Sequence, residues 1–434
     1  MQFRTAISLK ERWRYETWEK IIVIGFVILN SISGLQISGI SVNAVFVGLF
    51  TVFAGVEFLK HKNKGGMKIP RASGFLLFIL CSMVSCLFSM AYDFRVEHYD
   101  IVKSYLINST FYLVIFVLLF NCTNKYLSEC TDCYVNGIVW AARIQAIWGI
   151  LQLILQYGAG ININQILFVD ILHSTNTRDW IMGFFSGNSW NMRITGLNFE
   201  NSMFALVVCL GAALEKKKVW KFLLLATAVL SLSRTGWVMV AGYVIIVIIR
   251  KLKSNLKIKK SALVRNAIGG VTIIVASLAA YLKIPSIRRQ VSNILLRITD
   301  TGAINVSGMR HLLYYPYGFE IWLTRSNIFQ MLFGYGMRCS GAAFSEQQDI
   351  CRIIGIQQYS SAWAVECDVI GLLLGGGVCT LLAYYYEVVK CMKTKFKDAM
   401  IIIIFGGITY HYHSISYVIF LLMMASLSKV KKFD

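Results

Sequence analysis

Long apolar stretches are the feature that most limits what this chain can fold into. Runs of about 20 hydrophobic residues recur along the sequence, and an α-helix needs about this length to cross the hydrocarbon core of a bilayer. Hydrophobic residues make up 56% of the 434 positions and charged residues only 15%, which is too little polar surface for a soluble domain of this size. The sequence therefore predicts an all-α polytopic membrane protein.

Hydropathy predicts about 12 membrane-spanning helices, with 10 or 11 as alternatives because four apolar runs are short. Short runs can cross only as hairpin arms, or as helices extended by polar residues that face the protein interior. No internal repeat divides the chain, so residues 1–434 are expected to form a single membrane domain. The runs cover residues 20–37, 41–58, 73–91, 104–120, 134–155, 201–214, 221–232, 235–250, 265–282, 369–388, 399–409 and 415–427.

Lysines concentrate in alternate loops, which are expected on the cytoplasmic side together with both termini. Much of the net charge of +21 follows from this topology, and nucleic acid is therefore not an expected partner. The lysine-rich segments lie at residues 60–68, 216–218, 251–260, 393–397 and 429–432.

Two segments on the opposite side, residues 157–200 and 283–368, are long enough to carry function. Basic residues there are nearly all arginines, whose guanidinium groups form two-pronged hydrogen bonds with phosphate. Within the second segment, residues 308–333 predict one or two helices along the membrane interface, broken near Pro316. The outer arginines are Arg95, Arg178, Arg193, Arg234, Arg288, Arg289, Arg297, Arg310, Arg325, Arg338 and Arg352.

Two of these arginines stand beside predicted helix ends. Arg234 lies between two short apolar arms with Ser233 beside it, where it either binds an anion or reaches the lipid headgroups as an interface arginine. Arg193 precedes the run at 201, for which Asn198 and Asn201 are candidate caps. The N-terminal amides of that helix would point at a bound anion. The alternative for Arg193 is a solvated side chain in a capped loop.

Arg143 lies in the middle of the predicted span 134–155 and therefore needs a partner or water. An ion pair inside the bundle and a contact with substrate are equally compatible with the sequence. Gln145 and Gln152 do not share the helical face of Arg143, so no polar stripe is expected there.

Acidic and histidine residues near the last spans are candidates for proton transfer. Glu366 and Asp368 form an E-x-D at a membrane boundary, where a general base or a metal could reside. A capping role for Asp368 is the simpler interpretation. His411 and His413 are interpreted as residues of an interface turn, because two ligands are too few for a metal site.

Cysteine spacing predicts no zinc site, because Cys130 and Cys133 form a lone C-x-x-C without a second pair. Cys339 and Cys351 could form a disulfide in an oxidising compartment. The sequence contains no GxxxxGK[ST], GxSxG or HExxH motif, which argues against an ATP-driven pump.

Four segments occur in the order seen in the O-antigen polymerase and O-antigen ligase superfamily, which the chain resembles over residues 190–390. They are RITGLNFENSMFALVVCL, LSLSRTGWVMV, MRHLLYYPYGFEIW followed by LFGYG, and SSAWAVECDVIGLLL. The resemblance implies a membrane glycosyltransferase with a GT-C-like helical bundle, acting at the periplasmic face of a bacterial inner membrane. It also implies donor and acceptor glycans linked to undecaprenyl diphosphate, with neither a cofactor nor a metal.

The resemblance implies that Arg193, Arg234 and Arg310 engage the lipid diphosphate. Ligases of the superfamily carry a histidine where this sequence has Ser360, which favours the polymerase branch. Glu366 and His311 are then the candidates for the general base. The further candidates for substrate binding are Arg143, Asn198, Ser233, Arg338 and Ser360.

Two other functions stay open beside the polymerase. One is the ligase, and the other, from a different class, is a flippase for lipid-linked oligosaccharides. Membrane lipid and a chain-length regulator protein are the other expected partners of a polymerase.

Overall fold

The structure, a computed structural model, consists of helices joined by turns and loops in the residues that it describes, with one pair of two-residue strands. These strands, β1 (Gln36–Ile37) and β2 (Ile40–Ser41), pair antiparallel. The described residues are 18–32, 35–37, 40–63, 67–68, 73–92, 96–174, 194–198, 200–253, 306–353 and 365–429. The predicted span 265–282 lies outside them.

Within the described residues, five helices contain a segment long and apolar enough to cross a membrane. This agrees with an all-α membrane protein, whereas the number of 12 spans stays a prediction. The five are α2 (Val42–His61), α3 (Gly74–Tyr92), α4 (Val96–Phe120), α5 (Asn124–Ala159) and α16 (Asp368–Cys391). With 36 residues, α5 is about 54 Å long, so it reaches well beyond the predicted run 134–155.

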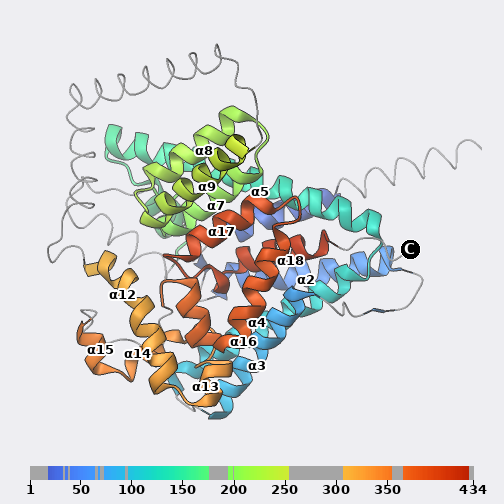
Figure 1. Cartoon of the computed structure of the whole chain (residues 1–434). Helices are drawn as coiled ribbons and strands as arrows, with labels where there is room; N and C mark the ends of the chain where they lie inside the picture. Colours follow the sequence, from blue (N-terminus) through green and yellow to red (C-terminus); the bar gives the residue numbers. More distant parts are fainter. Residues whose placement is uncertain are drawn as a thin grey trace, which may run out of the picture.

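The short apolar runs also form helices. Two of them, α7 and α18, are buried on nearly every side, as expected for helices inside a bundle. Figure 1 shows α7, α8 and α9 grouped beside α17, while α16 packs against α3. These helices are α7 (Asn201–Leu214), α8 (Lys218–Leu230), α9 (Arg234–Lys253), α17 (Lys397–Gly407) and α18 (Ser416–Leu427), and a further helix covers residues 18–30.

Residues 308–333 are helical as predicted, but the expected break at Pro316 is wrong. Pro316 lies inside α12 (Val306–Glu320), which continues into a π-helical turn, η3 (Ile321–Arg325). The break comes at Asn327 instead. Its side chain accepts hydrogen bonds from the first amides of α13 (Ile328–Phe333), so a new helix begins there. Two short helices follow, α14 (Ser340–Ser345) and α15 (Gln348–Ile353).

Basic residues at the lysine-rich helix ends pair with carboxylates of neighbouring helices. Lys395, before α17, contacts Asp132 of α5 at 2.5 Å. Lys429, after α18, contacts Glu387 near the end of α16 at 2.8 Å. Arg250 of α9 pairs with Asp398 of α17. Arg250 is near the end of α9 and Asp398 at the start of α17, while Lys429 and Glu387 lie at the ends of α18 and α16, and α16 leads directly into α17. The ends of α9, α16 and α18 therefore lie where α17 begins, and these three helices begin at the opposite end of the bundle, where α17 finishes.

Candidate functional site

The turn between α17 and α18, residues 408–415, is where several helices meet. Three hydroxyl groups tie this turn to α9, α12 and α7, which are far apart in the sequence. The bonds run from Thr409 Oγ1 to Thr235 Oγ1 (3.0 Å), from Tyr315 OH to the carbonyl of Ile408 (2.9 Å), and from Tyr412 OH to the carbonyl of Ser202 (3.1 Å).

A buried pair, Asp368 and His413, joins the start of α16 to this turn. Asp368 Oδ1 accepts hydrogen bonds from the backbone N–H of His413 (2.8 Å) and from its ring Nδ1 (2.7 Å). Both side chains are 1% exposed. The predicted capping role of Asp368 is therefore wrong. Its carboxylate accepts hydrogen bonds from His413 in the turn, and the N-cap residue of α16 is Cys367. His413 is buried as well, whereas the location of this turn at a membrane interface stays a prediction.

Gly371 makes this pair sterically possible. A Cβ atom at Gly371 would lie 2.8 Å from Cε1 of the His413 ring, closer than packed carbon atoms approach. The absence of a side chain thus lets the imidazole lie directly against α16.

Two carboxylates, Glu200 and Glu366, come within electrostatic range of each other beside the turn. Burial raises the pKa of Glu200, the hydrogen bond from Tyr410 OH opposes this, and the charge of Glu366 raises the pKa further. Glu366 itself is exposed, two residues before α16 begins. The raised pKa means that the Glu200 carboxyl holds its proton more readily than an ordinary glutamate.

His411 is a neutral imidazole in the same turn. Burial lowers the pKa of His411 to about 3, with further contributions from His413 and from the Arg338 charge. Its ring stacks on Tyr410, with centroids 4.4 Å apart. Arg338 is exposed and has a left-handed backbone, with φ of 67°.

Arg338 follows a chain segment that packs into a break in α16. Gly377 has a φ of 73° inside that helix, and a Cβ there would lie 2.1 Å from the carbonyl oxygen of Leu332. The backbone N–H of Tyr335 donates to the carbonyl of Leu374 at 2.7 Å, and Ser85 Oγ donates to the carbonyl of Gly375 at 2.9 Å. These bonds satisfy carbonyl groups that the break frees.

Glutamines of α5 hold the loop that leads into α7. Gln152 Oε1 accepts hydrogen bonds from the N–H groups of Gly196 (2.8 Å) and Thr195 (3.3 Å). Gln145 Oε1 accepts from the N–H of Leu197 at 2.7 Å. These glutamines are seven residues apart and share one helical face. They do not share the helical face of Arg143, so no polar stripe was predicted, but together they form one of their own.

The predicted capping of α7 by Asn198 or Asn201 is wrong. The N-cap residue is Glu200, without a side-chain capping bond. Asn198 lies buried in the loop before it. Asn201 Nδ2 donates to the carbonyl of Ser231, at the end of α8, at 3.2 Å.

Arg143 forms an ion pair, one of the two alternatives that the sequence left open. Its Nε and Nη2 donate to Glu215 Oε2 at 2.9 and 2.6 Å. The guanidinium lies between the rings of Trp140 and Trp220, 5.2 and 5.0 Å from their centroids. Its contact with substrate stays a prediction.

Arg234 and Ser233 form the start of α9, beside the turn. Arg234 is half-buried and is the first residue of the helix. Ser233 is buried, and its Oγ accepts a hydrogen bond from the N–H of Gly236 at 3.3 Å, so it helps to cap this helix. The neighbouring Thr235 bonds the turn directly.

Several predicted site residues are not placed by the structure. Arg193 and Ser360 lie outside the described residues. Arg310 and His311 belong to α12, but their side chains are not described. A pocket shared by Arg193, Arg234 and Arg310 therefore stays a prediction.

The cysteines are free thiols, so the predicted pairing of Cys339 with Cys351 is wrong. The Cys351 thiol donates instead to the carbonyl of Phe344 at 3.1 Å.

Comparison with known proteins gives no relative: no protein-family model matches the chain, and no curated protein matches it. Any assignment of function therefore depends on the residues of the site and on the resemblance of the four sequence segments.

Proposed function

We propose that this protein is a membrane glycosyltransferase that polymerises undecaprenyl-diphosphate-linked oligosaccharide repeats into O-antigen or a related surface polysaccharide. The observation that carries the proposal is the meeting of α7, α9, α12 and α16 at residues 408–415. This brings the start of α9, with Arg234, near two carboxylates at one end of an apolar helix bundle. The active site would face the periplasm, and both termini the cytoplasm.

The chemistry needs two things from the protein. As the bond between the anomeric carbon and the diphosphate oxygen breaks, negative charge develops on the leaving group and must be stabilised. Arg234 is the residue we assign to this task, with Arg310 and Arg193 as the resemblance implies. The amide groups at the start of α9 add positive potential at the same place.

The acceptor hydroxyl must lose a proton as the new bond forms. We assign this step to Glu366, because it is exposed at the site and its neighbour Glu200 has a raised pKa. His311 is the other candidate base. Arg338, Asn198 and Ser233 are proposed to position the substrate, whereas Arg143 is assigned to its ion pair with Glu215.

Arg234 provides the direct test. The change Arg234→Ala is expected to lower the polymerisation rate about 10²–10³-fold, as for the loss of one donor to a developing oxyanion. Arg234→Lys should recover only part of the rate, because lysine lacks the two-pronged geometry. The measurement is long-chain glycan on gels from cells that depend on this protein, normalised to its abundance in membranes.

The matched control is Arg352→Ala, an exposed arginine on α15, which should leave chain length unchanged. Normal glycan from both Arg234 variants at normal abundance would remove Arg234 from the mechanism.

The break in α16 favours a second candidate, a flippase for lipid-linked oligosaccharides, because transporters often bind their substrates at discontinuous helices. The two functions differ in what a deletion strain accumulates. Single repeats at the outer face indicate a polymerase, and repeats retained at the cytoplasmic face indicate a flippase. A ligase would leave complete polymer on the carrier lipid.

A further inference from the structure

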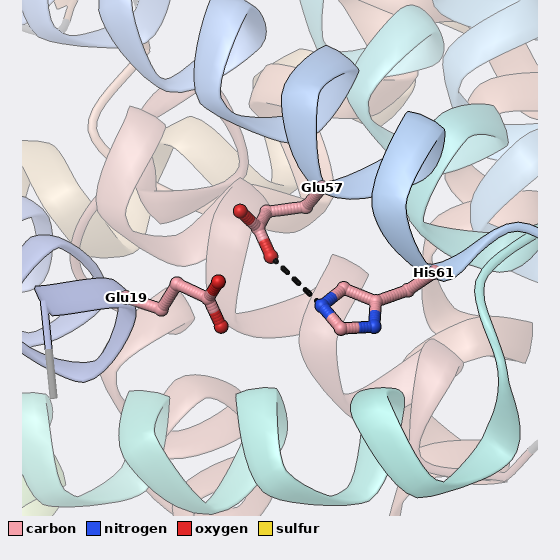
Figure 2. A group of neighbouring side chains, drawn as sticks. All are labelled: Glu19, Glu57 and His61. Carbon is pink, nitrogen blue, oxygen red and sulfur yellow. Dashed lines mark ion pairs between the residues drawn. The ribbon is translucent and has the colours of Figure 1, made fainter. Parts of the chain in front are cut away.

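Three side chains with metal-binding atoms gather at the lysine-rich end of the bundle, away from the turn described above. Glu19 lies on the helix over residues 18–30, and Glu57 and His61 lie on the last turns of α2. Figure 2 shows the two carboxylates and the imidazole directed toward one another from these two helices. One candidate ligand atom from each residue lies within 4.8 Å of the other two.

The burial of Glu57 sets this group apart from an ordinary acidic surface cluster. Its side chain is 1% exposed. Glu57 Oε2 and His61 Nε2 are both shielded from solvent, and neither makes a hydrogen bond. Leaving such atoms without a partner is energetically unfavourable, so the arrangement indicates a ligand between them.

The distance between these two atoms fits a metal ion better than a direct contact. They lie 3.4 Å apart, longer than an N–H···O hydrogen bond to a carboxylate. Two ligands that each lie about 2.0–2.1 Å from a tetrahedral zinc ion are separated by about 3.3 Å. Glu19, whose side chain is 20% exposed, has a candidate ligand atom within 4.8 Å of the other two and would have to move closer to complete the set.

The surrounding groups hold these ligands as outer partners do in known metal sites. Lys60 Nζ donates to Oε1 of Glu57 at 2.9 Å and to Oε1 of Glu19 at 3.1 Å, which leaves the other oxygen of each carboxylate for an ion. The His61 ring stacks on Tyr126, with centroids 4.5 Å apart. Contacts of this kind fix the orientation of metal ligands.

We propose that Glu19, Glu57 and His61 bind a divalent transition-metal ion of the Zn²⁺ type, which joins the helix over residues 18–30 to the end of α2. Two oxygens and one nitrogen suit such an ion, and a water molecule would take the fourth position. Among the described residues, the candidate ligand atoms that lie within 4.8 Å of one another here come from Glu19, Glu57 and His61 alone, so the nearby Cys122 is not assigned as a ligand.

The test is a titration of the full-length protein in detergent, stripped with a chelator, with Zn²⁺ by calorimetry and with Co²⁺ by visible absorption. Unmodified protein should bind one ion, with Co²⁺ bands typical of tetrahedral coordination. Glu57→Gln and His61→Asn should each weaken binding more than 100-fold, and Lys60→Gln about 10–100-fold, as for outer partners of a metal site. Glu19→Gln, at a more exposed position, serves as the ligand variant least disturbing to folding.

Two matched controls come from a neighbouring cavity, which Glu19, Glu129 and Cys133 help to line. Glu129→Gln and Cys133→Ser should bind Zn²⁺ as the unmodified protein does. Equal affinity in Glu57→Gln and unmodified protein, no binding by unmodified protein, or loss of binding only in Cys133→Ser would each overturn the proposal. None of these readouts depends on glycan synthesis.

Discussion

The pair Arg143–Glu215 allows the role of an arginine inside a membrane helix to be measured. Removing the Glu215 charge by Glu215→Gln leaves a guanidinium with 13% of its side chain exposed and no counter-charge. Breaking a buried ion pair from one side costs about 3–5 kcal/mol. We expect the lower part of this range, about 3 kcal/mol, because the rings of Trp140 and Trp220 still face the cation.

The double variant Arg143→Met with Glu215→Gln removes both charges together. It should be less destabilised than either single variant and lie within about 1 kcal/mol of the unmodified protein, because no charge is then left buried alone. The amide oxygen introduced by Glu215→Gln can still accept the hydrogen bond that the N–H of Lys217 donates to Glu215 at 2.8 Å. The assay is reversible unfolding in mixed micelles with increasing SDS, followed by circular dichroism.

Polymer formation by the same variants separates structure from substrate binding. If Arg143 acts only through its ion pair, the double variant makes long-chain glycan at close to the normal rate. A stable double variant that makes no polymer would restore Arg143 as a substrate contact. A cost below about 1 kcal/mol for Glu215→Gln would refute the energetic reasoning itself.

Three further predictions concern the elements that build the turn site. Gln152→Leu should lower the free energy of unfolding by about 1–3 kcal/mol, because loop amides lose their acceptor. The control is Gln156→Leu, which should cost less in the same SDS titration because Gln156 Oε1 has no hydrogen-bond partner. Gly371→Ala should destabilise the protein by steric overlap and Gly48→Ala should stabilise it slightly, as melting temperatures would show. Burial lowers the pKa of His411 in the folded state to about 3, against an ordinary value of 6.5. Below pH 6.5 the unfolded state binds a proton at this residue and the folded state does not, so stability decreases as the pH falls. Between pH 7 and pH 5 the melting temperature should therefore decrease less in His411→Gln than in the unmodified protein.

The sequence was sufficient to predict most helices of the described chain. Apolar runs such as 201–214 and 415–427 correspond closely to α7 and α18. The position of a buried helix can be predicted in this way because it depends on the local composition of the sequence. The break predicted at Pro316 was wrong for a local reason as well. A proline removes one helical hydrogen bond, whereas the capping side chain of Asn327 both ends one segment and starts another.

The site was harder to predict, because its contacts join residues far apart in the chain. Asp368 and His413 are 45 residues apart and Glu200 and Tyr410 are 210 apart. A polar residue in an apolar segment indicates that some partner exists, but its identity depends on which helices pack together. For this reason Arg234 and Glu366 could be proposed from their local sequence, and their roles stay predictions, whereas the partners of His413 and of the two glutamines of α5 could not be predicted.

The fold already neutralises some buried charged groups, whereas others still need a ligand. Arg143 pairs with Glu215, whose other carboxylate oxygen accepts a hydrogen bond from the N–H of Lys217, so this pair requires nothing from outside the protein. The Glu57 carboxylate has a partner for only one of its two oxygens. Lys60 neutralises Oε1, whereas Oε2 faces an imidazole nitrogen of His61 without a hydrogen bond. A protonated Nε2 would donate to the carboxylate at about 2.7–2.9 Å, whereas an unprotonated Nε2 and the carboxylate oxygen repel unless a cation lies between them. A proton would shorten their separation to that of a hydrogen bond, so the observed 3.4 Å favours the cation.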